Sequence, residues 1–457
     1  MLPSNRIPYR STIMKTYQSR RRFILQSGKL VAASAVAPVA GPLILSAEKG
    51  SPNERVRFGA IGVGGRGTSI ANAARRFADV VGVCDLDTQR IERVIKGFRA
   101  QDTSKGYQEY RKLLDRKDID FVTIGTTDHW HTRVAIHAMQ AGKDVYCEKP
   151  LTLTIDEGKQ ICKVVKETGR VFQVGTQQRS EMGQKFLQAI GIIREGRIGK
   201  VRKVTCNIGG GPKGGPFKTS APPANIDWNT WLGQAPLVDY IKERCHYQFR
   251  WWYEYSGGKM TDWGAHHVDI AQWALDQSGE GQGPLSIDPV IGEHPIPLKN
   301  GMPTKDNHYN TSHNFHIRCG FPDGVEMNIV SRSPEGNGIL FEGSKGKLLV
   351  SRGKLKGDAV NELKEKPLAS DTIKKIYKGK TPTNHMENFF QCVKDRKHPI
   401  SDVFTHHRAM TTCHLANISI RLGRKLTWDP KTEQIVGDSD ANSWLSREQR
   451  KGFETNT

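Results

Sequence analysis

Two short segments carry residue types that could move a proton to or from a hydroxyl group. Asp262 and His266 are four residues apart, so a helix would place them on one face and let the carboxylate orient the imidazole as a general base. Lys149 stands in Glu148-Lys149-Pro150, directly after a short β-branched run, and its ammonium could stabilise a developing alkoxide. We therefore predict that Lys149, Asp262 and His266 are catalytic.

A metal centre is the alternative use of the same side chains. Asp262, His266 and His267 could bind a metal ion with help from His129 and His131. An Asp/His pair at this spacing without a third spaced ligand is weak evidence for such a site, and we predict no metal.

A glycine-rich turn predicts a dinucleotide site. The segment Gly62-Val63-Gly64-Gly65-Arg66-Gly67 matches GxGxxG and stands between a predicted strand and a predicted helix. In this motif the glycines permit the tight turn, the approach of a pyrophosphate and close helix packing. Asp85 ends the second predicted strand, where a carboxylate accepts hydrogen bonds from a ribose 2′-hydroxyl and repels a 2′-phosphate. The expected cofactor is NAD, with NADP less favoured.

Together these motifs resemble the glucose-fructose oxidoreductase / inositol dehydrogenase family, often called Gfo/Idh/MocA, over about residues 54–430. The resemblance implies that the lysine and the Asp/His pair carry the chemistry. The loop Thr126–His131 resembles the family's loop after the fourth strand, with His131 at the position of its usual histidine. The pair Thr127-Asp128 stands where the family often has Pro-Asn, so the resemblance leaves the local contact to the nicotinamide ribose open. The expected cofactor residues are Gly62, Val63, Gly64, Gly65, Arg66, Gly67, Asp85, Thr126, Thr127, His131, Glu148 and Lys149.

The substrate side is predicted to be rich in aromatic rings. The segments Asp227–Trp231 and Tyr247–Tyr253 hold four of the nine Trp, and rings with interleaved polar groups suit the C–H faces and hydroxyls of a sugar. The segment Asn384–Pro430 resembles exported family members of polysaccharide-degrading bacteria, which implies a carbohydrate substrate. Burial in the core or at a subunit interface is the alternative for each ring. The expected substrate residues are Gln178, Arg179, Trp231, Arg250, Trp251, Tyr253 and His267.

The elements that must position these residues follow two rhythms. Up to about Thr176, β-branched runs at 56–61, 80–84, 121–125, 144–147 and 171–174 alternate with helical segments, which predicts a doubly wound parallel sheet. Later strand runs with turn signals predict an open, mostly antiparallel sheet, followed by a final helix that packs back on the first domain. The expected fold class is α/β, with an N-terminal Rossmann domain and a C-terminal α/β domain. The predicted domains are residues 1–50 (signal and linker), 54–176 (NAD binding), 177–430 (substrate and oligomerisation) and 431–457 (charged tail).

The N-terminus has the pattern of an export signal. The segment Ser19–Leu25 contains Arg20-Arg21-Arg22 and precedes a mildly apolar, acid-free stretch, Leu30–Leu45, which is the order of a twin-arginine signal. An amphipathic N-terminal helix is the alternative, which two prolines in the stretch would break. We expect a periplasmic protein exported by the twin-arginine machinery, cleaved near Ala47 or retained as a membrane tether.

Composition excludes several classes of protein. With 37% hydrophobic and 25% charged residues the chain is globular rather than disordered or fibrous, and beyond residue 50 it has no apolar run of 18 residues. Setting aside the first 47 residues leaves 61 basic and 47 acidic residues, and without a basic helix or zinc-finger spacing we expect a solvated surface and no nucleic-acid partner. The eight Cys are dispersed without a CxxC pair, which predicts buried thiols rather than disulfides.

The predicted function is hydride transfer between a carbohydrate hydroxyl carbon and a tightly bound NAD. A second hypothesis keeps NAD but oxidises a glycoside transiently, eliminates the aglycone and returns the hydride, giving net hydrolysis. A third is a binding protein that keeps the fold without turnover. Because an open sheet face needs covering, and because the family resemblance implies it, we expect a homodimer or homotetramer.

Overall fold

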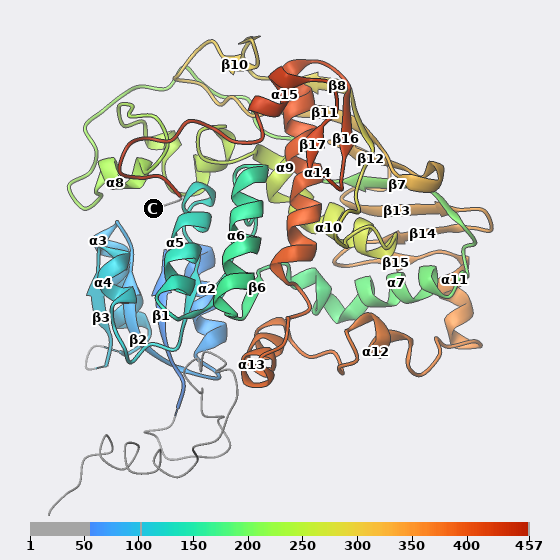
Figure 1. Cartoon of the computed structure of the whole chain (residues 1–457), viewed down its shortest axis with the longest axis horizontal. Coiled ribbons are helices and arrows are strands. Elements are labelled where there is room, and N and C mark those ends of the chain that lie inside the picture. The colour runs from blue at the N-terminus through green and yellow to red at the C-terminus, as the bar shows by residue number, and fades with distance from the viewer. Residues whose placement is uncertain (1–54, 101–102, 456–457) are drawn as a thin grey trace, which may run out of the picture. The chain divides into compact units, whose positions relative to one another are not determined.

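Two sheets, one parallel and one mixed, organise the chain (Figure 1). The computed structural model describes residues 55–100 and 103–455, all of which belong to one unit of the chain. The predicted twin-arginine signal lies outside these residues. The α/β fold class is confirmed, with the parallel sheet N-terminal and the mixed sheet C-terminal.

The N-terminal sheet has six parallel strands in the order β3-β2-β1-β4-β5-β6. This is the doubly wound order, in which the direction of winding reverses between β1 and β4. Its strands are β1 Arg57–Ile61, β2 Asp79–Cys84, β3 Lys105–Tyr107, β4 Phe121–Ile124, β5 Asp144–Cys147 and β6 Phe172–Val174. Its helices are α2 Gly65–Ala74, α3 Thr88–Gly97, α4 Tyr110–Leu114, α5 Asp128–Gln140 and α6 Ile155–Thr168.

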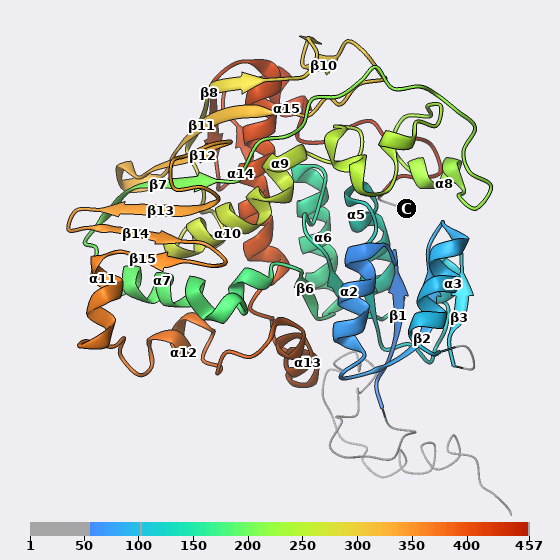
Figure 2. The ribbon, with the colours of Figure 1, turned by 180° about the vertical axis from the view of Figure 1, so that it is seen from behind.

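Helices cover both faces of this sheet. Every residue of β4 and β5 is buried, as the continuous apolar runs of a covered parallel strand require. Helices α5 and α6 lie on the face toward the viewer in Figure 1, and α2 lies on the face seen in Figure 2. Helix α13, His385–Asp395, joins the α2 side, where Phe389 packs edge-on against Phe121 with ring centroids 5.5 Å apart. A C-terminal helix thus completes the core of the first domain.

The C-terminal sheet has nine strands in the order β15-β14-β13-β7-β12-β11-β8-β16-β17. All neighbours are antiparallel except β12 and β7. Its strands are β7 Val201–Asn207, β8 Ser286–Glu293, β11 Asn314–Gly320, β12 Glu326–Val330, β13 Gly338–Gly343, β14 Lys347–Val350, β15 Leu355–Lys356, β16 Leu426–Asp429 and β17 Gln434–Ile435, and β9 Leu298–Lys299 pairs with β10 Met302–Pro303 in a separate hairpin.

Helices cover one face of this sheet. Helix α14 contacts β8, α10 contacts β7 and α7 contacts β14, and together they enclose the largest apolar core. The other face carries polar pairs, among them Arg318 with Asp288 and His316 with Asn328. The helices are α7 Lys185–Arg194, α8 Trp228–Leu232, α9 Gly258–Asp262, α10 Gly264–Ala274, α11 Asp358–Asn361, α12 Thr372–Ile376, α14 Val403–Leu422 and α15 Ser439–Ser443, with short 3₁₀ turns at η2 Gln177–Arg179, η3 Met182–Gln184, η4 Lys242–Arg244, η5 His246–Trp251, η6 Pro322–Gly324 and η7 Glu362–Lys364.

The two domains are joined along α14 and the C-terminal segment. Helix α14 lies between the two sheets in both views and packs on α6, as expected for a final helix that returns to the first domain (Figures 1 and 2). The predicted charged tail is structured over its described part, since it contains β17 and α15. Beyond α15, Arg450 donates to the carbonyl of Gly233 at 2.8 Å and Thr455 is fully buried.

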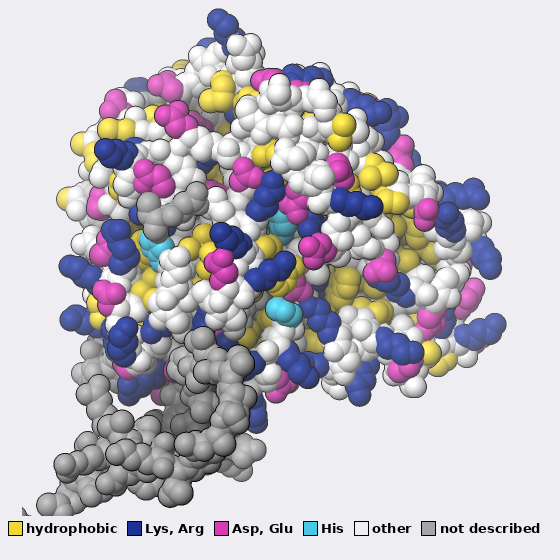
Figure 3. Space-filling model, in the orientation of Figure 1, with side chains coloured by type: hydrophobic (Ala, Val, Ile, Leu, Met, Phe, Trp, Pro, Cys, Tyr) yellow, Lys and Arg dark blue, Asp and Glu magenta, His cyan; other side chains and the backbone are white. Residues whose placement is uncertain are grey.

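Surface and side-chain chemistry are those of a globular domain. On the face drawn in Figure 3, Lys and Arg are scattered among Asp and Glu rather than gathered in one stripe. All eight Cys are free thiols, seven buried and Cys162 half-buried. Within residues 55–100 and 103–455 no helix is long and apolar enough to cross a membrane. The same residues contain no group of three His, Cys, Asp or Glu side chains placed to hold a metal ion.

Candidate active site

A cavity of about 560 Å³ lies at the carboxyl ends of β1, β2, β4 and β5. This is the edge at which ligands bind in open α/β sheets, beside the point where the strand order reverses. The loops after these strands form one wall. The opposite wall comes from the C-terminal domain, through residues of α8, η5 and α9. The cavity therefore joins both domains.

The glycine turn shapes one end of the cavity. Gly62 has φ +73°, and a Cβ on Gly67 would lie 1.8 Å from the carbonyl oxygen of Gly62, so α2 approaches β1 as only glycine permits. Gly65 begins α2 and faces open space, and the first turn has no side-chain cap. Free backbone N–H groups at a helix N-terminus suit a pyrophosphate. Gly62, Gly64, Gly65 and Arg66 line the cavity, whereas Val63 and Gly67 form the turn beneath it.

Asp85 connects the glycine turn to the second strand. Its carboxylate accepts hydrogen bonds from the backbone N–H of Val63 at 2.8 Å and of Asp87 at 3.0 Å. Burial raises the pKa of Asp85 above its ordinary value, against the lowering effect of Arg90. Both side chains line the cavity, so the expected 2′-hydroxyl acceptor stands next to a cation.

Beside the glycine turn, the loops after β4 and β5 offer buried polar atoms without partners. Thr126 Oγ1 and Glu148 Oε2 make no hydrogen bond, although Glu148 Oε1 accepts from Arg66 Nε at 2.9 Å. Thr126 and Thr127 line the cavity, and His131 lies between the carbonyl oxygens of Pro150 at 2.7 Å and Thr126 at 3.2 Å. These orphaned donors and acceptors, together with the glycine turn, fit a bound dinucleotide.

Lys149 and Asp262 meet across the domain boundary. Lys149 Nζ lies 2.5 Å from Asp262 Oδ1 and 3.2 Å from the Asp262 carbonyl oxygen, and both residues line the cavity. Burial by itself would raise the pKa of Asp262, but the charges of Lys149 and Arg250 outweigh it and lower the pKa to about 2. Asp262 is therefore ionised at all working pH values and holds the ammonium at the cavity wall.

The expected contact between Asp262 and His266 is absent from the described structure. The His266 backbone N–H donates to the Trp263 carbonyl at 3.0 Å, and the Asp262 carbonyl accepts from Lys149 instead, so the helical hydrogen-bond pattern is interrupted at Trp263, between α9 and α10. His266 is buried and does not line the cavity. Burial, reinforced by Lys149, lowers its pKa well below the ordinary value, so the ring is neutral. Its role as a general base stays a prediction.

Asp128 is an ionisable group at the site that sequence reasoning recorded only as a departure from the family pattern. It begins α5, lines the cavity and accepts a hydrogen bond from Ser256 Oγ at 2.5 Å. Burial raises the pKa of Asp128 to about 7, although Ser256 and Lys149 lower it. An amide at this position would not titrate, so the substitution places a proton donor and acceptor near neutrality within the cavity.

Two of the predicted substrate residues line the cavity and two neighbours do not. Arg250 and Trp231 form part of its wall. Trp251 Nε1 donates to Gln248 Oε1 at 2.8 Å, and the Tyr253 hydroxyl lies 3.0 Å from His294 Nε2, on the far side of the η5 segment. Trp251 and Tyr253 are buried in packing contacts, which was the alternative stated for these rings.

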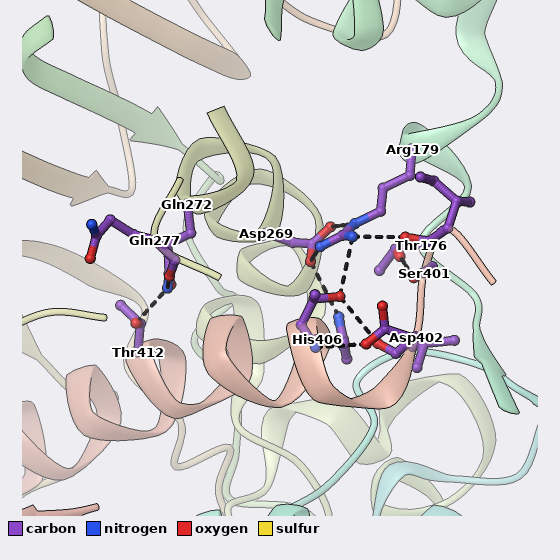
Figure 4. Close-up of polar contacts among 12 residues, drawn as sticks. Thr176, Arg179, Asp269, Gln272, Gln277, Ser401, Asp402, His406 and Thr412 are labelled. Carbon is purple, nitrogen blue, oxygen red and sulfur yellow. Dashed lines mark hydrogen bonds and ion pairs between the residues drawn. The ribbon is translucent and has the colours of Figure 1, made fainter. Parts of the chain in front are cut away.

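The residues predicted at the domain junction are placed in the interior. Arg179 is fully buried and donates from Nε and its terminal nitrogen to both oxygens of Asp269, at 2.7 and 2.6 Å (Figure 4). His267 Nε2 lies 3.0 Å from Asn337 Oδ1, and Gln178 is buried with an amide that has no partner. None of the three lines the cavity. Arg179 is turned into the packed junction between the domains, and His267 is turned toward Asn337, between β12 and β13 of the C-terminal domain.

Lys259 and Arg352 are cations near the site that sequence reasoning did not select. Lys259 Nζ lies 5.8 Å from the ring centroid of Trp263, and Arg352 Cζ lies 4.5 Å from the same ring. Lys259 lies three residues before Asp262 in the same glycine-rich segment, so its position in the sequence could have indicated that it lies near the site. Arg352 follows β14, and only the fold brings it to Trp263.

Comparison with known proteins agrees with this architecture. The profile described as the oxidoreductase family, NAD-binding Rossmann fold, matches residues 56–176, and the profile of that family's C-terminal alpha/beta domain matches residues 215–455. The chain is 29% identical over 206 residues to an alpha-N-acetylgalactosaminidase of Shewanella oneidensis, covering 40% of this chain and 44% of that protein. It is 30% identical over 150 residues to an inositol 2-dehydrogenase of Salmonella typhimurium, covering 32% and 43%. The matches span less than half the length of these curated relatives.

Solved structures share the fold at low identity. The WlbA dehydrogenase of Chromobacterium violaceum, crystallised with NADH and UDP-GlcNAcA, superposes with a TM-score of 0.59 at 16% identity, over 85% of this chain and 98% of that one. The N-terminal domain is thus an NAD-binding Rossmann domain, as the sequence predicted.

Proposed function

Because the chain belongs to the Gfo/Idh/MocA oxidoreductase family, we propose that it is an NAD-dependent oxidoreductase acting on a hydroxyl carbon of a carbohydrate. The observation that carries this proposal is the Lys149–Asp262 pair, which lies at the wall of the cavity that the glycine turn enters. A binding protein without turnover has no evident need for an ammonium fixed at this point.

Different residues of the cavity would bind different parts of NAD. The N-terminus of α2 would hold the pyrophosphate, Asp85 the adenosine ribose, and Thr126 with Glu148 the nicotinamide half. When bound, NAD supplies the acceptor for a hydride from the hydroxyl carbon. Lys149 would donate a hydrogen bond to the substrate oxygen and stabilise the negative charge that develops on it. Asp262 holds that ammonium at the cavity wall.

The hydroxyl proton needs an acceptor, and two side chains are candidates. His266 is the predicted base, but it does not line the cavity. Asp128 does, and its pKa of about 7 suits proton transfer near neutral pH. Activity profiles against pH for His266→Asn and Asp128→Asn separate them, because only loss of the true acceptor removes the limb that reports its titration.

A second candidate function is NAD-dependent glycoside cleavage by transient oxidation and elimination. The similarity to an alpha-N-acetylgalactosaminidase favours it, although that similarity covers 40% of the chain. Both functions use the same lysine, since oxidation of a hydroxyl carbon is the first step in each.

One screen tests both functions. Purified protein is incubated with a panel of sugars and of aryl glycosides, with nucleotide reduction and aglycone release followed separately. A keto sugar with reduced nucleotide supports the dehydrogenase, and aglycone release without net reduction supports the elimination route. Neither product across the panel would contradict the proposed function.

We propose further that the protein acts outside the cytoplasm with NAD retained. The arginine-rich N-terminal segment motivates export, and a cavity walled by both domains suits retention. Keeping sites filled at about micromolar protein without free NAD needs a binding free energy of about −9 kcal/mol or better. Near-stoichiometric NAD released on denaturing dialysed protein supports retention, and empty protein that binds NAD only at high micromolar concentrations contradicts it. A homo-oligomer remains our expectation, measurable by light scattering.

A further inference from the structure

Three cations of the C-terminal domain gather around Asp262. Arg250 lies in η5 and lines the cavity, Lys259 lies in α9 three residues before Asp262, and Arg352 follows β14. Lys259 and Arg352 both lie against Trp263, the residue directly after Asp262. Arg250 thus presents its charge to the cavity, and Lys259 and Arg352 lie behind the cavity wall near Asp262.

Aromatic rings, not carboxylates, hold these three side chains. Arg250 Cζ lies 3.9 Å from the ring centroid of Tyr247, and its buried Nε has no hydrogen-bond partner. Lys259 Nζ lies 5.9 Å from the Trp251 ring in addition to its contact with Trp263. Within the described chain no hydrogen bond and no ion pair joins the side chain of Arg250, Lys259 or Arg352 to another residue. Ring faces orient a cation and leave its N–H donors free.

The nearby acids are already engaged. Asp262 pairs with Lys149 and Glu148 pairs with Arg66, and the Asp262 charge also acts on Arg250 and Lys259, so several cations share each of these carboxylates. Asp128 is only partly ionised near neutral pH. Burial lowers the pKa of Lys259, Asp262 raises it, and Arg250 and Lys149 lower it further, so the balance remains against the charged form of Lys259.

Bound NAD would not supply the missing anion. Its pyrophosphate belongs at the N-terminus of α2 in the first domain, whereas Arg250 lines the cavity from η5 of the facing domain, and the oxidised nicotinamide ring is itself cationic. The counter-ion must therefore come from the substrate, which is the second ligand of the cavity.

We propose that Arg250 binds a carboxylate on the substrate at the cavity wall, with Lys259 and Arg352 adding positive charge from behind it, so that the sugar oxidised is a uronic acid or a glycoside of one. This inference rests on the proposed function and specifies its substrate class. The planar guanidinium of Arg250 stacks on Tyr247 with its N–H edges open, which matches the two oxygens of a carboxylate. Lys259 and Arg352 add charge from the facing side of Trp263.

Matched ligand pairs test this recognition by binding, independently of turnover. The NAD-loaded protein is titrated calorimetrically with methyl β-D-glucuronide and methyl β-D-glucoside, and with the corresponding galacturonide and galactoside. We expect at least one uronide to bind ten-fold or more tightly than its neutral partner. Arg250→Gln should reduce that ratio about ten-fold, and Lys259→Met and Arg352→Gln less, with the NAD content of each variant unchanged. Arg202→Gln removes the same charge from an exposed position on β7 and should change nothing.

Several results would overturn the inference. These are equal affinity for both members of every pair, no uronide binding, variants that weaken acidic and neutral ligands alike, or tight binding of glucose 6-sulfate in place of a uronide. Loss of NAD from Arg250→Gln would also overturn it, because that arginine would then hold the cofactor. Selective uronide binding without any turnover would contradict the proposed oxidoreductase and support the carboxylate site. Turnover of neutral sugars without uronide selectivity would support the proposed oxidoreductase and contradict the carboxylate site.

Discussion

Two ion pairs seven residues apart on the same segment behave as opposites. Asp262 pairs with Lys149, and Asp269 pairs with Arg179, so each links the helices α9 and α10 to residues that follow strands of the first sheet. The side chains of the first pair are 16% and 13% exposed, and those of the second are 1% and 0% exposed.

The difference lies in what else each cation touches. Arg179 also donates to the Ile400 carbonyl at 2.8 Å and to Thr405 Oγ1, so its donors are satisfied by α14 and the turn before it (Figure 4). Among residues 55–100 and 103–455, the Lys149 ammonium has Asp262 as its one hydrogen-bond and ion-pair partner, and Lys149 lines the cavity. An ion pair that is fully buried, like Arg179–Asp269, serves the packing of the domains. An ion pair that lines a cavity, like Lys149–Asp262, remains available to a ligand.

Breaking the sealed pair should give the largest effect on stability. Asp269→Asn leaves the Arg179 charge buried without a counter-ion, and we expect a loss of about 3–5 kcal/mol in unfolding free energy. Urea unfolding followed by fluorescence measures it. Asp276→Asn, which breaks an exposed pair with Arg194, is the control and should cost less than about 1 kcal/mol. Equal losses of unfolding free energy in the two variants would show that the buried pair stabilises the fold no more than an exposed pair does.

Removing the open cation should act on turnover instead. Lys149→Met takes away the donor to the developing alkoxide, and we expect the turnover number to fall about 10²–10³-fold. Retained NAD, measured after denaturation, should stay near the parent value. Lys163→Met, at an exposed position on α6, serves as control. Loss of NAD with unchanged turnover per bound nucleotide would show that Lys149 holds the cofactor and does no chemistry.

Acid should weaken the open pair in a defined range. The pKa of Asp262 is about 2 in the folded protein and 3.8 ordinarily, so its contribution is complete above pH 4 and is lost as pH falls toward 2. The stabilisation is on the order of 2 kcal/mol, and about half of it is lost by pH 3. Unfolding free energies of the parent and of Asp262→Asn, measured from pH 6 to pH 3, should therefore converge as the pH falls. Parallel curves would mean that Asp262 does not titrate in this range.

The smallest expected effect concerns the adenosine end of the cavity. Asp85→Asn keeps an oxygen that accepts from the Val63 N–H but removes the charge that repels a 2′-phosphate, beside Arg90. We expect the preference for NAD over NADP to fall about ten-fold, or about 1.4 kcal/mol. Fluorescence titration with the two nucleotides measures it. Asp79→Asn, at the opposite end of β2, is the control, and an unchanged preference in Asp85→Asn would assign the discrimination to another residue.

Local patterns predicted most of the first domain. The expected strands at 80–84 and 144–147 differ from β2 and β5 by at most one residue, because buried parallel strands form continuous apolar runs. The three-residue strand β3 was missed, since Lys105–Tyr107 has no apolar run and pairs only through its backbone with β2. Strand β8 was missed because Pro289 interrupts it, at the register shift opposite β11.

The sequence by itself determined the parts of the site that depend on neighbours along the chain. The glycine turn, the aspartate at the end of β2 and the lysine after β5 each act within one strand-loop-helix unit, so spacing was enough to find them. The tertiary structure alone decided that Asp262 pairs with Lys149 rather than His266, that Arg179 is sealed while Arg250 is open, and that Arg352 reaches Trp263. These outcomes depend on which groups the packing of the two domains brings together and which groups it removes from water. The strength of a charge interaction and the pKa of a group follow from that burial, and not from the position of the residue in the chain.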